Sequence, residues 1–269
     1  MRLSFVRCLE RIGGPSVDVQ TMATIRTILG ISFFAGSTAE VVEKMVVEKG
    51  LLLAPAAPAL LSMQTISAYR DALLGADTVI ADSGFMVLLW NALERDAVPR
   101  ISGLRYLRAL LNRKEIRQPG KTLWVMAGPD SARRNLEWLA TAGIAVPNQC
   151  VYLAPMYRPD INDPILLEKI GTVRPDHIIV TIGGMTQERL GFYLKKNLNY
   201  RPGIHCIGAA IAFLSGDQVK IPDWADRLYL GWLFRVWSNP RLYAPRYWQA
   251  VRLTTLLLRY RSNLPPFLG

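Results

Sequence analysis

Three glycine-bearing turns, each directly after a short apolar run, contain the polar residues most able to bind or transform a substrate. The first is Ala81-Asp82-Ser83-Gly84, the second is Gly128-Pro129-Asp130, and the third runs from Gly183 to Glu188. Each turn precedes the expected start of a helix, where free amide hydrogens can bind the oxygens of a diphosphate. Ligands of open α/β sheets collect at the carboxyl ends of the strands, so the turns predict a site at that edge.

Each turn also has a structural interpretation. Asp82 and Asp130 could serve as turn or helix-capping residues, and Gln187 and Glu188 could lie on an ordinary first helical turn. The chain contains no GxGxxG, GxxxxGK[ST] or GxSxG, which argues against the usual dinucleotide, nucleoside triphosphate and serine hydrolase sites. It also lacks the Asp-x-Asp motif by which many sugar-nucleotide enzymes hold a divalent metal. We therefore expect no metal and no cofactor.

The C-terminal end of the chain is strongly basic and aromatic. Its last 43 residues hold seven arginines, nine aromatic rings and no acidic residue. This mixture is typical of protein at a lipid headgroup layer, where each Arg near anionic lipid contributes about 1 kcal/mol. A solvated helix face and a nucleic-acid arm are the alternatives. The aromatic residues argue against the first, and the lack of a helix-turn-helix, zinc or RNP signature argues against the second. We expect an anionic membrane surface, and no nucleic acid, as the partner.

The overall composition indicates one large folded domain in a reducing compartment. The chain has 269 residues, of which 51% are hydrophobic, and a formal net charge of +11. Its three cysteines lie far apart and predict neither disulfides nor a zinc site. His177 and His205 each adjoin an apolar run, and we expect structural roles for both. No apolar stretch near the start is long enough for a signal sequence, and prolines between Gly50 and Tyr69 disfavour a spanning helix there.

Short apolar runs that alternate with amphipathic segments must position the three turns. These runs are Ile25 to Phe33, Leu51 to Ala54, Thr78 to Ala81, Thr122 to Ala127, Cys150 to Leu153, His177 to Ile182 and Ile204 to Ile207. They predict the strands of βα units. The expected fold class is α/β, with a Rossmann-like, mostly parallel sheet that has helices on both faces.

Helix-capping signals lie between these runs. Ser37 and Glu40 are predicted to form a capping box at the start of one helix. Asp130 is predicted to cap another helix, and Asp163 to cap a third that begins with Pro164. These signals agree with the alternation of strands and helices.

The pattern changes after Gly208 to helical, aromatic-rich segments that Pro222, Pro240 and Pro245 are expected to interrupt. Within this part, Leu253, Leu256, Leu257 and Tyr260 share one helical face and predict an amphipathic helix. We predict an N-terminal extension (residues 1–24), an α/β catalytic domain (25–219) and a basic, aromatic-rich C-terminal helical appendage that associates with the membrane (220–269).

The order of the motifs along the chain is more specific than any one of them. In sequence they are the Ala-Asp-Ser-Gly turn, Pro99-Arg100-Ile101-Ser102-Gly103, Gly128-Pro129, the Gly-x-x-x-Gln-Glu stretch that ends at Glu188, the segment from Gly208 to Gly216, Pro222-Asp223-Trp224 and Trp232-Leu233-Phe234-Arg235. This order resembles the WecG/TagA/CpsF glycosyltransferases, family 26 of the sequence-based classification. The resemblance covers roughly Ile28 to Trp248, nearly the whole chain.

The resemblance implies a bacterial, metal-independent, inverting enzyme and assigns roles to single residues. Asp82 matches the proposed catalytic base, Arg100 matches the arginine that steadies the departing nucleotide diphosphate, and Gln187 matches the glutamine of the sugar pocket. Further residues expected to bind substrate are Ser83, Gly128, Gly183, Gly184 and Glu188. Residues expected to contact the lipid-linked diphosphate and the membrane are Arg235, Arg241 and Arg246.

The chain departs from the family pattern at several places. Where members commonly have Thr-Pro-Asn, this sequence reads Ala54-Pro55-Ala56, so two hydrogen-bonding side chains are absent. The usual Gly-x-Pro-x-Gln-Glu becomes Gly-Gly-Met-Thr-Gln-Glu, which ends at Glu188. Because Asp82, Arg100 and Gln187 remain, we expect an altered sugar rather than lost activity.

The expected function is transfer of a hexose from a UDP-sugar to an undecaprenyl-diphosphate-linked saccharide, for an exopolysaccharide or a cell-envelope polysaccharide. The expected location is peripheral, on the cytoplasmic face of the bacterial inner membrane. The alternative is a non-catalytic, membrane-associated UDP-binding or scaffold protein descended from such an enzyme, motivated by Ala54 and Ala56. The sequence leaves the donor sugar, the acceptor sugar, the linkage and a homo-oligomeric state open.

Overall fold

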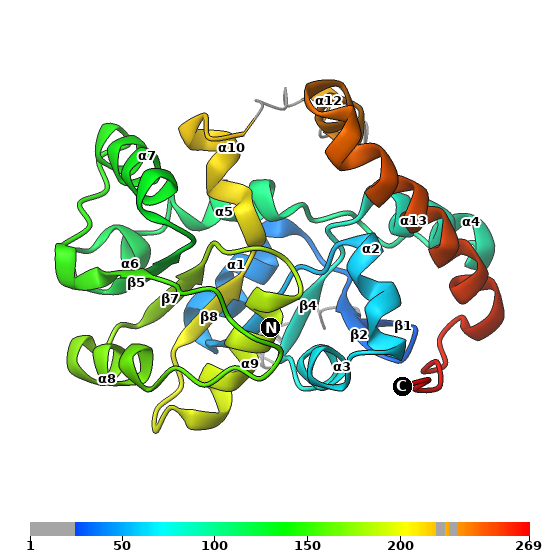
Figure 1. Ribbon diagram of the computed structural model, residues 1–269, viewed down its shortest axis with the longest axis horizontal. Helices are drawn as coiled ribbons and strands as arrows, with labels where there is room; N and C mark the ends of the chain where they lie inside the picture. Colours follow the sequence, from blue (N-terminus) through cyan, green and yellow to red (C-terminus); the bar gives the residue numbers. More distant parts are fainter. Residues whose placement is uncertain (1–24, 219–223, 226–230) are drawn as a thin grey trace, which may run out of the picture.

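An eight-stranded sheet forms the centre of the computed structural model, which describes residues 25–218, 224–225 and 231–269 (Figure 1). The strands are β1 (Ile25–Ile28), β2 (Ile31–Phe34), β3 (Gly50–Leu53), β4 (Thr78–Ile80), β5 (Thr122–Met126), β6 (Val151–Leu153), β7 (His177–Val180) and β8 (Gly203–Cys206). Their spatial order is β1-β2-β4-β3-β8-β7-β5-β6. All pairs among β2 to β8 are parallel, and the β1–β2 pair is antiparallel. The predicted α/β class with a mostly parallel sheet is confirmed.

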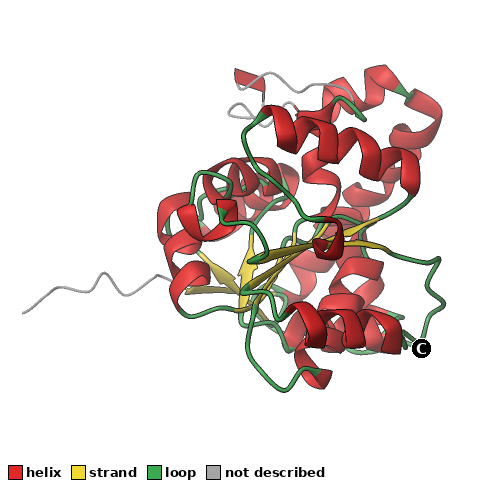
Figure 2. Cartoon of the chain, turned by 90° about the vertical axis from the view of Figure 1, so that its left-hand side faces the viewer, coloured by secondary structure: helices red, strands yellow, loops and turns green. Residues whose placement is uncertain are grey.

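Helices cover both faces of this sheet, as Figure 2 shows. One face carries α2 (Ala57–Leu60), α3 (Ser67–Leu74), α4 (Gly84–Glu94), α8 (Pro164–Val173), α9 (Thr186–Asn197) and the last part of α13 (Pro240–Tyr260). The other carries α1 (Thr38–Val47), α5 (Gly103–Leu110), α6 (Lys114–Arg117), α7 (Pro129–Thr141) and α10 (Ala212–Ser215). Three short 3₁₀ turns and one further helix complete the described elements: η1 (Leu61–Gln64), η2 (Asn148–Cys150), η3 (Gly208–Ile211) and α12 (Gly231–Ser238).

Side chains of the apolar strands contribute to two separate hydrophobic cores, one on each face of the sheet. In β3, Leu51 and Leu53 pack in the core under α9 and α3, whereas Leu52 packs in the core under α1 and α5. Side chains of a strand alternate between faces, so a run that is apolar at every position must be covered on both sides. All four residues of β3 are buried, as this requires.

The first predicted strand is wrong as a single element, because Ile25 to Phe33 forms a hairpin. Leu29 and Gly30 are its two loop residues, with φ of 52° and 75°, the positive values that a tight hairpin turn of this kind needs. Their amides donate to the carbonyls of Arg261 (2.7 Å) and Ser262 (2.9 Å), so the far end of the chain holds the turn in place. A Cβ at position 30 would lie 2.6 Å from the Leu264 side chain, which makes glycine necessary there.

Two of the three helix-capping predictions are confirmed, and one is wrong. The capping box is confirmed, since Ser37 accepts from the Glu40 amide and Glu40 accepts from the Ser37 amide. Asp163 caps α8, as expected. Asp130 does not cap α7: the helix begins one residue earlier, at Pro129, so Asp130 lies inside the first turn.

The C-terminal helix α13 is continuous through Pro245, so the predicted interruption at that proline is wrong. The predicted apolar face is confirmed, because Leu253, Leu256 and Leu257 are buried in the core beside α2 and α4. This end of the chain therefore packs on the α/β domain. The predicted extension 1–24, Pro222 and the predicted boundary near Lys220 lie outside the described residues, and a membrane-associating appendage stays a prediction.

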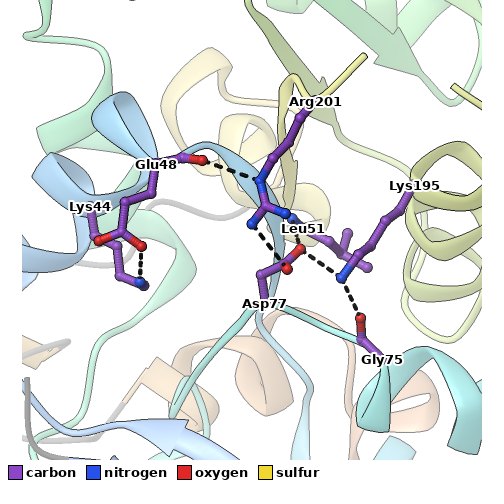
Figure 3. Close-up of polar contacts among 7 residues, drawn as sticks. All are labelled: Lys44, Glu48, Leu51, Gly75, Asp77, Lys195 and Arg201. Carbon is purple, nitrogen blue, oxygen red and sulfur yellow. Dashed lines mark hydrogen bonds and ion pairs between the residues drawn. The ribbon is translucent and has the colours of Figure 1, made fainter. Parts of the chain in front are cut away.

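Ion pairs tie the amino ends of the strands together (Figure 3). Asp77, just before β4, accepts from the Leu51 amide (2.7 Å), from Lys195 (2.8 Å) and from Arg201 (3.1 Å). Burial of Asp77 opposes its ionisation, but these hydrogen bonds and charges prevail and hold its pKa below the usual value. This cluster joins β3, β4, α9 and the loop before β8 at the edge opposite the candidate site.

Candidate active site

The three glycine-bearing turns lie at one edge of the sheet, as predicted. They follow β4, β5 and β7, three strands that run parallel within the same sheet, so their carboxyl ends share an edge. The turn after β8, at Gly208, lies at this edge too. Helices α4, α5, α7 and α9 all start there, and their free amide hydrogens make it suited to an anionic ligand.

Asp82 is held by residues of the segment that leads into α5. Its Oδ1 accepts a hydrogen bond from the amide of Gly103 at 2.9 Å. Its backbone carbonyl accepts from Nε of Arg100 at 2.8 Å, and the Ile101 amide donates to the Ala81 carbonyl at 3.1 Å. Among the described residues, none donates to Oδ2 of Asp82. One carboxylate oxygen is therefore anchored, and the other can accept a proton from a substrate.

The structure brings Arg100 next to Asp82, as the resemblance implied, but through the backbone rather than through the carboxylate. The hydrogen bond to the backbone holds the Arg100 guanidinium at the same edge of the sheet as Asp82. That bond does not pair the guanidinium with the Asp82 carboxylate. Both side chains are partly buried. A guanidinium so placed can hold diphosphate oxygens with two parallel hydrogen bonds.

Two serines cap the helices beside Asp82. Ser83 accepts from the Met86 amide at 3.2 Å, and Ser102 accepts from the Arg105 amide at 3.1 Å. Within the described chain, neither α4 nor α5 has an acidic residue in its first turn, so the carboxylate nearest to the positive end of α5 is that of Asp82, which accepts from the Gly103 amide. Ser83 thus has a structural role in addition to any contact with substrate.

Gln187 and Glu188 are buried below the edge of the sheet. Gln187 is 2% exposed and Glu188 is 1% exposed. The Gln187 side chain accepts from the Gly208 amide (2.5 Å) and donates to Oε1 of Glu188 (3.2 Å). Burial raises the pKa of the Glu188 carboxyl to about 7, although nearby amides, Gln187 and Arg189 act in the opposite direction.

The remaining predicted glycines lie at more open positions. Gly183 and Gly184 are exposed, Gly128 is partly exposed, and an added Cβ at any of them would meet no atom within 4 Å. Arg189 stabilises the turn after Gly184 by donating from Nε to the Met185 carbonyl at 2.9 Å. These segments leave backbone groups accessible to a ligand.

Gly103 and Gly208 lie within the sequence motifs, but neither was predicted to belong to the site. Each donates its amide to a predicted site residue: Gly103 to Asp82 and Gly208 to Gln187. The two also lie close together, because a Cβ at position 103 would be 3.1 Å from the Ile207 carbonyl oxygen. The motif spacing was a signal for their importance, but it did not indicate which atoms meet.

The histidines have the structural environment that was predicted. His177 and His205 are buried, their rings are bonded through Nδ1 and Nε2 at 3.1 Å, and His205 also bonds the hydroxyl of Tyr106 at 2.8 Å. Burial lowers the pKa of His177 to about 4. A cavity of about 230 Å³ adjoins His177, Lys49 and Lys121, but it lies at the amino ends of the strands, away from Asp82.

The predicted membrane arginines lie on the last two helices. Arg235 belongs to α12, Arg246 belongs to α13, and their side chains lie outside what the structure describes. Arg241, in the first turn of α13, is exposed. In the described parts of the chain, no helix is long and apolar enough to cross a bilayer. Nor do the residues described there include a group of three or more His, Cys, Asp and Glu side chains placed to hold a metal ion.

Comparison with known proteins gives one family. No curated protein matches the chain. The model of the glycosyl transferase WecG/TagA/CpsF family matches residues 26–265, which includes all the strands but the first residue of β1 and every candidate site residue named above. The chain therefore belongs to the WecG/TagA/CpsF family, whose members are glycosyltransferases of cell-envelope polysaccharide synthesis.

Proposed function

We propose that this chain transfers a hexose, with inversion and without a metal, from a UDP-sugar to an undecaprenyl-diphosphate-linked saccharide. The observation that carries the proposal is the arrangement around Asp82. One carboxylate oxygen is fixed by the Gly103 amide, no described residue donates to the other, and Arg100 adjoins the same residue. A fixed base beside a cation and two helix N-termini suits attack by a hydroxyl and departure of a diphosphate.

In the proposed reaction, Oδ2 of Asp82 takes the proton of the acceptor hydroxyl while the hydroxyl oxygen attacks the anomeric carbon. The bond from that carbon to the UDP oxygen breaks, and its electron pair leaves with UDP. Arg100 and the first turns of α4 and α5 stabilise the charge that develops on the diphosphate. Attack from the face opposite the leaving group inverts the anomeric configuration.

Peripheral binding to the cytoplasmic face of an anionic inner membrane is part of the proposal, because the acceptor carries a polyprenyl chain. The described parts of α12 and α13 expose Trp237 (86%) and Trp248 (77%), and Arg241 is exposed at the start of α13. Large aromatic side chains near arginine are typical of protein at a headgroup layer.

The direct test is incubation of the purified protein with a synthetic lipid-linked sugar and a panel of nucleotide sugars, with Mg²⁺ and with a chelator. We expect UDP release from one donor in both conditions, with NMR of the product showing inversion. Loss of turnover in the chelator would contradict the metal-independent mechanism. Absence of turnover with every donor would contradict the proposed reaction.

A second candidate is a membrane-associated protein that binds UDP without catalysis. It is favoured by the turn after β3, where Ala54 and Ala56 provide no hydrogen-bonding side chain at the edge that holds Asp82. Tight UDP binding measured by calorimetry, together with no turnover across the donor panel, would select this candidate.

A further inference from the structure

Glu188 is a buried carboxyl group without a salt-bridge partner among the described residues. Its Oε1 accepts from Gln187, and its Oε2 is buried with no hydrogen-bond partner in the described structure. The Tyr69 hydroxyl, from α3, is likewise buried and unpaired there. A buried polar atom without a hydrogen-bond partner destabilises the folded protein, so a carboxyl group at this position requires a functional or structural explanation.

A series of four contacts leads from Glu188 to Asp82. The Glu188 carboxyl holds Nε2 of Gln187 at 3.2 Å, which leaves Oε1 of Gln187 directed at the Gly208 amide at 2.5 Å. Gly208 follows Ile207, whose carbonyl oxygen lies against Gly103. Gly103 in turn donates to Oδ1 of Asp82.

The Gln187 amide can satisfy both partners in only one orientation. If the side-chain amide rotated by half a turn, its NH₂ group would face the Gly208 amide, and two donors would oppose each other. The carboxyl oxygen of Glu188 prevents this, because it accepts from NH₂ and would repel the amide oxygen. Glu188 therefore selects the orientation that supports the turn at Gly208.

We propose that Glu188 is a positioning residue that acts through Gln187 to hold the turn at Gly208 against the Gly103–Asp82 contact. The expected effect on turnover rests on the proposed function. The effect on the turn at Gly208 does not, because it exists without substrate. The groups that face Glu188 among the described residues are Arg189 on its own helix, Tyr69 on α3 and Cys206 on β8. None of these forms an ion pair with it that would replace the bond to Gln187.

The test uses Glu188→Met, an apolar side chain of similar length whose sulfur is only a weak hydrogen-bond acceptor, and Glu188→Gln, whose amide oxygen is a good acceptor. Hydrogen exchange of the full-length protein reports directly on the Gly208 amide. We expect a peptide that spans 204–212 to exchange about 10-fold faster in Glu188→Met, and within about 3-fold of wild type in Glu188→Gln. Peptides that cover β5 should not change.

A double-mutant comparison separates positioning through Gln187 from a general loss of packing. Gln187→Met removes the acceptor of the Gly208 amide, so adding Glu188→Met to it should cause little further increase in exchange at 204–212. Additive effects of the two substitutions would overturn the proposal. Unchanged exchange in Glu188→Met would overturn it as well.

The second measurement is turnover in the lipid-linked sugar assay. We expect kcat to fall about 10- to 100-fold in Glu188→Met, with a smaller change in the KM for the donor, and to recover largely in Glu188→Gln. Glu168→Met, at an exposed position of α8, is the matched control and should leave both measurements unchanged. Wild-type protein without turnover would count against the proposed function, whereas the exchange experiment would still decide the role of Glu188.

Discussion

The amide nitrogen of Gly103 lies 2.9 Å from Oδ1 of Asp82, although 21 positions separate the two residues in the chain. This hydrogen bond joins the turn after β4 to the first residue of α5. It orients the carboxyl group at the amino end of that helix. No described residue donates to Oδ2, as the proposed role of Asp82 as a base requires.

Replacing Asp82 should abolish most of the activity. We expect Asp82→Asn to lower kcat about 10²- to 10⁴-fold, because the amide keeps an acceptor for the Gly103 amide but cannot take the acceptor proton. UDP release in the lipid-linked sugar assay measures the effect. Asp71→Asn, at an exposed position of α3, serves as the control. Equal turnover by Asp82→Asn and wild type would rule out the assignment of the base.

Asp77 should stabilise the protein at neutral pH and lose this effect in acid. Its pKa is lowered in the folded state, so its contribution is present above the unfolded value of about 3.8 and is lost as the pH falls through the folded value. We expect Asp77→Asn to lower the free energy of unfolding by about 1 to 3 kcal/mol at pH 7, and by less toward pH 3. Urea denaturation followed by circular dichroism measures both. A difference that did not depend on pH would show that the charge of Asp77 is unimportant.

Glu188 should have the opposite dependence on pH. Its folded pKa of about 7 lies above the ordinary value of 4.5, so the folded state binds the extra proton and stability falls as the pH rises between these values. The slope from this group is at most about 1.4 kcal/mol per pH unit. Glu188→Gln removes it, so the free energy of unfolding of the variant, relative to wild type, should be higher at pH 8 than at pH 5. Denaturation curves at both pH values, with Glu168→Gln as the control, provide the measurement.

The exposed tryptophans should contribute to membrane binding. We expect Trp237→Ser with Trp248→Ser to weaken binding to vesicles of phosphatidylglycerol about 10-fold or more, because two large aromatic surfaces leave the headgroup layer. Binding of the wild type should also weaken with salt, as expected for arginine near anionic lipid. Sedimentation with vesicles of anionic and of neutral lipid distinguishes the two contributions. Replacement of exposed Met156 by Ser, on the loop after β6, provides a control for loss of apolar surface elsewhere.

Local chemistry in the sequence was sufficient to predict much of this fold. The capping box at Ser37 and Glu40 and the cap at Asp163 depend on residues three positions apart, so they could be recognised without a structure. The apolar runs, buried on both faces, predicted the parallel strands, and the edge of the sheet that holds Asp82 followed from that topology. Leu29-Gly30 was missed because a continuous apolar run concealed a two-residue turn.

Contacts between distant segments required the tertiary structure. The sequence by itself determined which residue types stand at the carboxyl ends of the strands, because strand and helix patterns repeat over a few residues. Only the folded chain decided that Gly103 meets Asp82, that Arg100 approaches its backbone, and that Gln187 and Glu188 turn inward. Such pairings depend on how helices pack on a twisted sheet, which sets distances between residues that spacing along the chain leaves undetermined.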